Sequence, residues 1–228
     1  MRLLALDTAT ELCSAALWLD GVVSVCEAVR PRGHGELILP MIEQLLGRAG
    51  LCLHELDAIA FGRGPGAFTG VRLAASIAQG LAFALDLPLL PVSDLRALAA
   101  QALARPAAPT RVLICQDARM DEVYWGCFEQ AGDVPVAVGP EGLGAAQSVA
   151  LPPAWEHSNV CGAGSGFAAY SASLSALAGE LSPVMPELRP HAREIALLAA
   201  HAGLDCAVPP EQGEPVYLRD VVTAGPVR

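Results

Sequence analysis

Residues 61–85 read FGRGPGAFTGVRLAASIAQGLAFAL, a glycine-rich turn followed directly by an apolar helical pattern. Four glycines and one proline fall within residues 62–70. Glycine permits positive φ angles and close backbone approach, and the start of a helix presents unpaired N–H groups. The segment therefore suits an anion-binding or partner-docking loop, to which Arg63 and Arg72 would add positive charge. A tight strand-to-helix turn explains the same spacing, and the spacing alone favours it.

Two helices are expected around this turn. The one over Phe68–Leu85 carries small residues on more than one face, so it is either a core helix or one shared with a partner; Thr69 is its candidate N-cap. The other begins near Leu37, where apolar residues recur at three- and four-residue steps until Gly50 stops the pattern. Pro40 fits best within the first turn of that helix.

The surrounding sequence predicts an α/β fold made of two similar units. In the first unit a hairpin at residues 20–21 (Asp-Gly) joins two apolar runs, and Ser93 caps a helix that ends near residue 104. Residues 105–110 read as a linker, after which a second strand–turn–strand opening places Asp117 where the first unit has Asp7. Such a duplication predicts a ribonuclease-H-like, two-lobed architecture of the actin and sugar-kinase type. The strands expected in the first unit are 3–7, 13–19, 22–29, 58–61 and 89–92, and those in the second are 111–115, 121–128 and 134–138.

Composition narrows the possible functions. Hydrophobic residues make up 53% and charged residues 17% of the 228 residues, which excludes intrinsic disorder. All 14 basic residues are arginine, so phosphate-binding, Schiff-base and Ser–Lys mechanisms that need lysine are excluded. The net charge of −10 argues against tight binding of nucleic acid by this chain alone. The seven dispersed cysteines, the early carboxylate at Asp7 and the lack of a long uninterrupted apolar stretch lead us to expect a cytoplasmic protein without a membrane anchor.

Other motifs leave the chemistry open. Asp7 and Thr8 end a strand and open a turn, where they suit either a magnesium–phosphate site of the kinase type or an Asx turn held by side chains. Residues 162–166 (GAGSG) resemble a dinucleotide fingerprint only loosely, and a plain turn before a helix over 167–177 is preferred. The five histidines show no metal-binding spacing. The chain therefore reads as an enzyme-like fold without a recognisable catalytic set.

Several strings together resemble the TsaB (YeaZ) family of bacterial tRNA threonylcarbamoyladenosine biosynthesis proteins. They are residues 4–10 (LALDTAT), 34–41 (HGELILPM), 62–72 (GRGPGAFTGVR), 117–125 (DARMDEVYW) and 215–219 (PVYLR). The resemblance covers nearly the whole chain and is densest in residues 1–95. It implies the two-lobed fold, with a first lobe over 1–105 and a second over 106–228; whether the last residues pack back on the first lobe is left open.

The resemblance also implies a role. TsaB proteins are non-catalytic partners of the homologous subunit TsaD, and the complex modifies adenosine 37 of tRNAs that read codons beginning with A. By this resemblance, ATP or ADP and magnesium are used by the complex, which includes the ATPase TsaE. This chain contacts tRNA only within the complex and binds no cofactor tightly. Alone, the chain could pair with itself. The partner surface is expected on the helices over 37–49 and 68–85, with Ile38, Met41, Leu45, Val71, Ala74, Ala75 and Ala78 as contact residues. The candidate nucleotide or anion loop comprises Asp7, Thr8, Arg63, Gly64, Gly66, Thr69 and Arg72.

No metal site is expected. In the catalytic relatives a segment like VNHLEGHI provides two metal-binding histidines, and here Asp94 and Leu98 occupy those two places. Leucine cannot coordinate a metal. Two enzyme readings remain as rivals to the scaffold role: a self-contained metallohydrolase of the glycoprotease type, and an ATP-dependent small-molecule kinase of the same superfold.

Overall fold

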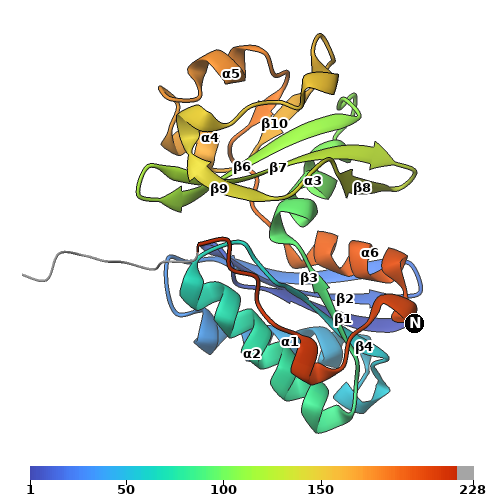
Figure 1. The fold of residues 1–228 in the computed structure, drawn as a ribbon. Coiled ribbons are helices and arrows are strands. Elements are labelled where there is room, and N and C mark those ends of the chain that lie inside the picture. Colours follow the sequence, from blue (N-terminus) through green and yellow to red (C-terminus); the bar gives the residue numbers. More distant parts are fainter. Residues whose placement is uncertain (220–228) are drawn as a thin grey trace, which may run out of the picture.

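A computed structural model describes residues 1–219, and in it two mixed sheets lie one above the other (Figure 1). The first sheet has the order β3-β2-β1-β4-β5, in which β1 pairs antiparallel with β2 and parallel with β4. The Asp20-Gly21 hairpin is confirmed, because Leu19 faces Val22 and both turn residues have positive φ. The strands are β1 (Arg2–Asp7), β2 (Leu12–Leu19), β3 (Val22–Val29), β4 (Ala58–Gly62) and β5 (Leu89–Val92).

The second sheet repeats this plan. Its order is β11-β10-β6-β7-β8, with an antiparallel β6–β7–β8 meander and parallel neighbours β10 and β11 on the other side of β6, and β9 pairs with β7. This correspondence confirms the predicted duplication. The strands are β6 (Arg111–Arg119), β7 (Glu122–Ala131), β8 (Val134–Ala137), β9 (Gly142–Ala145), β10 (Cys161–Ala163) and β11 (Val184–Met185).

Helices cover both faces of the first sheet. α1 (His34–Ala49) and α2 (Phe68–Leu85) pack on one face, and α6 (Ala192–Ala202) packs on the other. α3 (Asp94–Leu103) follows the first sheet in sequence, yet its apolar side chains pack against the second sheet. The chain after β11 makes the opposite crossing, since α6 returns to the first sheet. Each sheet is therefore completed by a helix from the other half of the sequence.

Several local predictions were wrong. α1 begins at His34, one turn before the expected start, so Pro40 lies inside the helix. Thr69 is not the N-cap of α2, because Ala67 takes that position without a side-chain cap. The helix expected over 167–177 is two short ones, α4 (Gly166–Ala169) and α5 (Ser175–Gly179). Ser93 does cap α3, because its Oγ accepts a hydrogen bond from Arg96 N at 3.2 Å. The 3₁₀ turns are Leu53–Glu55, Ala146–Ser148, Pro153–Trp155, Leu204–Cys206 and Pro210–Gln212.

One glycine fixes where α2 meets the sheet. A Cβ on Gly70 would overlap the carbonyl oxygen of Thr8 at the end of β1. The helix can approach the strand this closely only because residue 70 has no side chain. Gly80, ten residues further along the same helix, is exposed and has open space around its Cα.

These two glycines make a matched test. We expect Gly70→Ala to lower the free energy of unfolding by about 1–3 kcal/mol, because the added methyl group forces α2 away from β1. Gly80→Ala should raise that free energy by up to about 1 kcal/mol, since alanine is the better helix former and meets no obstacle. Urea denaturation of both variants measures the difference, and equal effects at the two positions would contradict the packing described here.

Candidate functional site

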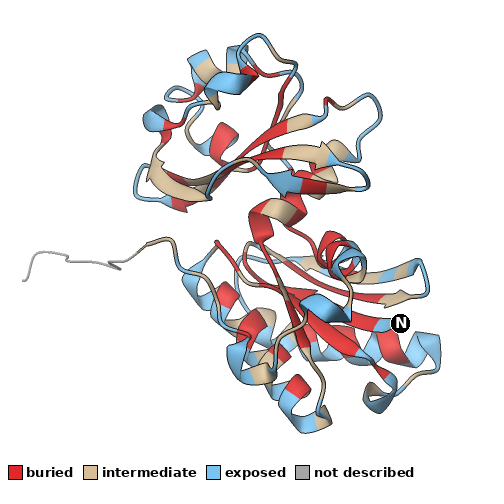
Figure 2. Cartoon of the chain, turned by 45° about the vertical axis from the view of Figure 1, so that its right-hand side comes forward, coloured by how far each residue is buried: buried red, intermediate tan, exposed pale blue. Residues whose placement is uncertain are grey.

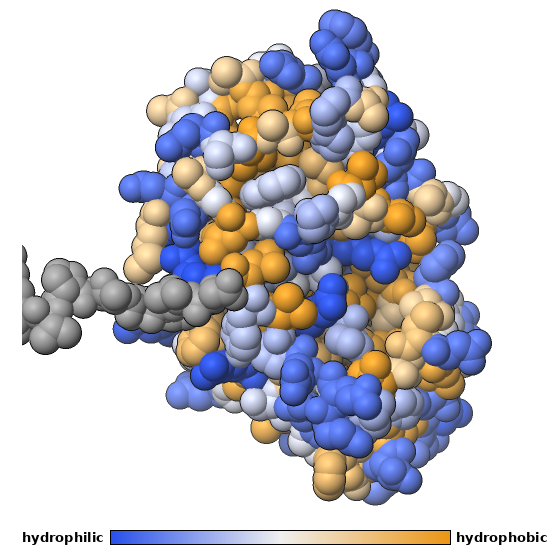
Figure 3. Space-filling model, viewed as in Figure 1, coloured by the Kyte–Doolittle hydropathy of each residue, from blue (hydrophilic) through white to orange (hydrophobic). Residues whose placement is uncertain are grey.

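A cleft of about 850 Å³ lies between the two lobes. Figure 3 shows apolar and strongly hydrophilic side chains next to each other at this junction. The first lobe contributes the β1–β2 turn and the loop before α2, and the second contributes the β6–β7 turn and α4. The end of the described chain lines the cleft as well. The polar residues on its walls include Thr10, Glu11, Gln116, Asp117, Arg119, Ser165, Arg189, Tyr217 and Arg219.

Asp7 and Thr8 do not reach this cleft. Both side chains are fully buried. Thr8 Oγ1 donates to the carbonyl oxygen of Gly70 at 2.6 Å, and Asp7 Oδ1 accepts from the backbone N–H of Ala9 at 2.7 Å. Of the two readings of this segment the structure shows the Asx turn. Asp7 Oδ2 has no hydrogen-bond partner within residues 1–219, but it is buried and does not line the cleft.

The glycine-rich loop is a strand-to-helix turn whose backbone groups pair within the chain. Arg63 N donates to the carbonyl oxygen of Val92 at 2.9 Å, and Gly64 N donates to a carboxylate oxygen of Asp94. Asp94 N in turn donates to the carbonyl oxygen of Gly64 at 3.0 Å. Because the N–H groups of Arg63 and Gly64 are used internally, the structure agrees with the strand-to-helix turn, the reading that the spacing favours. Gly64 is buried, and Gly66 alone of the candidate anion-loop residues lines the cleft.

Arg72 and Thr69 lie on the outer surface of α2. The Arg72 guanidinium stacks 3.8 Å from the centre of the Phe68 ring, and its Nε donates to the hydroxyl of Tyr217 at 2.7 Å. This arginine is therefore held between two aromatic rings at the start of the helix. It is available to a macromolecule that packs on α2.

Asp7 and Asp94 form a buried carboxyl pair that the sequence did not reveal. Both are fully buried, and one oxygen of each, Asp7 Oδ2 and Asp94 Oδ1, has no hydrogen-bond partner within residues 1–219. Burial raises the pKa of Asp7 to about 6, and burial together with the Asp7 charge raises the pKa of Asp94 well above its usual range. One proton shared between the two carboxyl groups satisfies both, as expected for like charges that cannot ionise together in a dry site.

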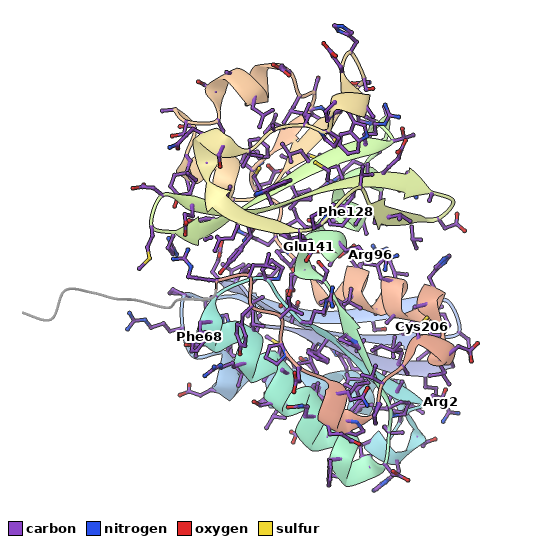
Figure 4. All side chains as sticks on the ribbon, in the orientation of Figure 1. Arg2, Phe68, Arg96, Phe128, Glu141 and Cys206 are labelled. Carbon is purple, nitrogen blue, oxygen red and sulfur yellow. The ribbon has the colours of Figure 1, made fainter. Side chains whose placement is uncertain are left out.

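The surroundings of this pair leave little room for anything but a proton. A Cβ on Gly62 would overlap Asp94 Oδ1, so only glycine is tolerated there. The charged groups nearby are His191, which lowers the pKa of Asp7, and Glu141, which raises that of Asp94 and accepts a hydrogen bond from Ser93 Oγ. Figure 4 places Glu141 at the junction of the two lobes. The pair thus ties the end of β1 to the loop before α2 and to the start of α3.

Within residues 1–219 no group of three or more histidine, cysteine, aspartate or glutamate side chains is arranged to hold a metal ion. Asp94 is committed to Gly64 and Asp7. Leu98, at the second of the two places where catalytic relatives have histidines, is fully buried in apolar surroundings.

The residues expected at the partner surface point the wrong way. All seven are buried inside the chain, where α1 and α2 pack on the first sheet (Figure 2). The prediction is wrong because the most regular apolar stripe of each helix covers the helix's own sheet. These inward residues are Ile38, Met41, Leu45, Val71, Ala74, Ala75 and Ala78.

The outward face of these helices carries three large apolar side chains among polar ones. Leu39, Phe68 and Phe83 are 46%, 43% and 75% exposed. Along α2, Ser76 and Gly80 lie one turn apart on the exposed side. α2 is also, among the described residues, the one helix long and apolar enough to cross a membrane by length and composition, with 33% of that window buried in the protein.

Comparison with known proteins shows which family this chain resembles. Residues 27–223 match the sequence model of the family described as TsaD, tRNA N6-adenosine threonylcarbamoyltransferase. A solved structure of YeaZ from Pseudomonas aeruginosa is 43% identical, with a TM-score of 0.85, and the alignment covers 95% of this chain and 99% of that one. The chain belongs to the TsaB (YeaZ) branch of the TsaD family.

Curated TsaB proteins are similar to this chain in sequence as well. The tRNA threonylcarbamoyladenosine biosynthesis protein TsaB of Escherichia coli is 50% identical over 130 residues, which are 57% of this chain and 56% of that protein. Its counterpart in Haemophilus influenzae is 51% identical over 125 residues, or 55% of this chain and 52% of that protein. The chain thus spans a little over half the length of these TsaB relatives in the alignments. The fold expected from the family, a duplicated ribonuclease-H-like unit, is the one described above.

The Asp7–Asp94 pair predicts a pH dependence of stability. Because both pKa values are raised in the folded protein, the folded state binds more protons than the unfolded state above about pH 4, so the pair's contribution to stability falls as the pH rises. We expect the wild-type protein to gain, relative to Asp94→Asn, on the order of 1–3 kcal/mol on going from pH 8 to pH 5. The amide keeps an acceptor for Gly64 N and gains a donor for Asp7, so the variant should fold.

Chemical denaturation at several pH values measures this difference. Glu11, Asp20 and Glu55, whose pKa values are lowered, act in the opposite direction, but they are common to both proteins and cancel in the comparison. Parallel pH profiles for the two proteins would show that no proton is shared at this site.

Proposed function

We propose that this chain is a non-catalytic subunit that supports the transfer of a threonylcarbamoyl group to adenosine 37 of tRNAs reading codons that begin with A. It does so by forming a heterodimer with a catalytic homologue of the TsaD type. Family membership supports the pathway, since the E. coli and H. influenzae relatives carry the name of tRNA threonylcarbamoyladenosine biosynthesis proteins. The cytoplasm, where tRNA is modified, is the corresponding location.

The observation that carries the proposal is the outward face of α1 and α2. Phe83 is three-quarters exposed at the C-terminal part of α2, and Phe68 and Arg72 are exposed at its start. Exposed aromatic side chains on a protein of net charge −10 favour an interaction surface on this face. A homologous subunit has equivalent helices, so the natural partner presents a matching pair.

Helix packing explains how the two pairs would meet. The exposed positions Arg72, Ser76 and Gly80 follow one another at four-residue steps. Ridges of this spacing interlock with those of another helix, and small residues along the ridge let the two backbones approach. A contact of standard size buries about 800 Å² on each partner. In the absence of the catalytic subunit, the same face would pair with a second copy across a two-fold axis.

The non-catalytic assignment rests on the chemistry of the described residues. The Asp7–Thr8 turn is closed by hydrogen bonds within the chain, and the side chain of Leu98 cannot coordinate a metal ion. ATP or ADP, magnesium and the ATPase TsaE then belong to the assembled complex, and tRNA is bound through the catalytic subunit rather than by this acidic chain. The two rival functions predict different properties of the purified chain. A metallohydrolase would contain a stoichiometric transition metal and cleave a peptide substrate. A small-molecule kinase would bind ATP at micromolar concentration.

Substitutions on the outward face test the docking surface. We expect Ser76→Glu and Phe83→Glu each to weaken copurification with the catalytic homologue at least tenfold, because each places a charge in an apolar contact. In a reconstituted tRNA-modification assay, with the other components fixed, both variants should lower the yield of modified tRNA to that seen without this chain.

Leu197→Glu is the matched control. Leu197 is 36% exposed on α6, which packs on the opposite face of the same sheet. This variant should bind and support modification like the wild type. If all three variants bind equally well while remaining folded by circular dichroism, the partner does not dock on α1 and α2.

A further inference from the structure

The end of the described chain crosses from the first lobe to the second. After α6 the chain returns along the first sheet, where Val208 and Leu89 exchange two backbone hydrogen bonds of 2.8 Å. Residues 213–219, here named the C-terminal strap, then run past the loop before α2 toward the second lobe. In Figure 1 this segment reaches the junction of the lobes at the left, where the grey trace begins, and α3 lies to its right.

The strap is fixed to the first lobe by residues 216 and 217. Val216 N donates to the carbonyl oxygen of Arg63 at 2.7 Å, and the Val216 carbonyl packs against Gly64. Tyr217 lies over the start of α2, with its ring centre 5.7 Å from that of Phe68 and its hydroxyl bonded to Arg72. These contacts make a compact first anchor.

Arg219 fixes the strap to the second lobe. Its Nη2 lies 2.6 Å from Glu122 Oε2 and donates to the carbonyl oxygen of Ala118 at 3.1 Å. Its Nη1 lies 2.9 Å from the sulfur of Met120. The Arg219 side chain is only 18% exposed, so this is a partly buried anchor with several partners on the β6–β7 turn, in contrast to an isolated surface ion pair.

We propose that the C-terminal strap is a clasp that holds the cleft between the lobes closed. Only Leu218 separates the two anchors, and a chain of this length spans at most about 7 Å between the Cα atoms of residues 217 and 219. The lobes therefore cannot separate at this rim unless one anchor releases. Residues 216–219 also line the cleft, so release of the strap removes one of its walls.

The remaining links between the lobes allow such a movement. The chain crosses between them at Ser93, between β5 and α3, and again between β11 and α6. A second ion pair, Glu11 to Arg189 at 2.6 Å, joins the β1–β2 turn to the latter crossing. These crossings are the places where a hinge would bend, and the strap is the contact that would limit it.

Hydrogen exchange on the full chain tests the clasp. In Arg219→Ala we expect the backbone amides of both cleft walls, residues 9–11 and 66–68 in the first lobe and 117–120 in the second, to exchange at least threefold faster than in the wild type. Trypsin should also cleave after Arg119 at least threefold faster, since that residue lies in the freed turn. Glu122→Gln, which removes the ion pair from the other side, should change exchange in the same direction.

Tyr217→Ala separates a clasp from a local brace of the turn. The hydrogen bond and the aromatic contact of Tyr217 are both made to the first lobe, so this variant should accelerate exchange of residues 117–120 only if the strap transmits the restraint. Arg48→Ala, an exposed arginine in the last turn of α1, is the matched control and should leave exchange of the cleft walls unchanged. Faster exchange confined to 117–120 in Arg219→Ala, or an unchanged turn in Tyr217→Ala, would overturn the proposal.

Discussion

Close contact between a glycine and the backbone of a central strand sets the geometry of both lobes. In the first lobe Gly70 of α2 lies against the carbonyl of Thr8, just after β1, and in the second Gly166 of α4 lies against the carbonyl of Cys115, in the middle of β6. A side chain at either glycine would push the helix off its strand. The cleft walls, the outward face of α2 and the first anchor of the strap all take their positions from the first of these contacts.

This close contact also explains why Asp7 and Thr8 have a structural role. When α2 closes on β1, the hydroxyl of Thr8 is directed into the helix and Asp7 is sealed from solvent, where it meets Asp94. Residues that suit phosphate binding in an open turn are therefore used here for structure. The outward face of the helix and the cleft between the lobes remain available to other molecules.

Local signals were enough to predict much of the fold. The Asp-Gly pair at residues 20–21 and the cap at Ser93 depend on neighbours in sequence, and both were found where expected. The duplicated order of strands followed from two similar openings at Asp7 and Asp117. The sides of α1 and α2 were assigned wrongly, because an apolar stripe shows that a face is buried without showing what buries it. The Asp7–Asp94 pair joins residues 87 positions apart, and the strap joins residue 219 to the β6–β7 turn. Neither contact could be predicted, because both link segments that are distant in the sequence.

The exchange of helices between the two sheets has a consequence for how the protein folds. α3 supplies Leu95 and Leu98 to the core of the second sheet, while α6 supplies Ile195 and Ala196 to that of the first. Neither half of the polypeptide can bury both faces of its own sheet, so a cut in the loop at 105–110 would leave two fragments, each with one bare apolar face. Folding of the two sheets is then coupled, and on the ribosome the first sheet stays incomplete until α6 has emerged.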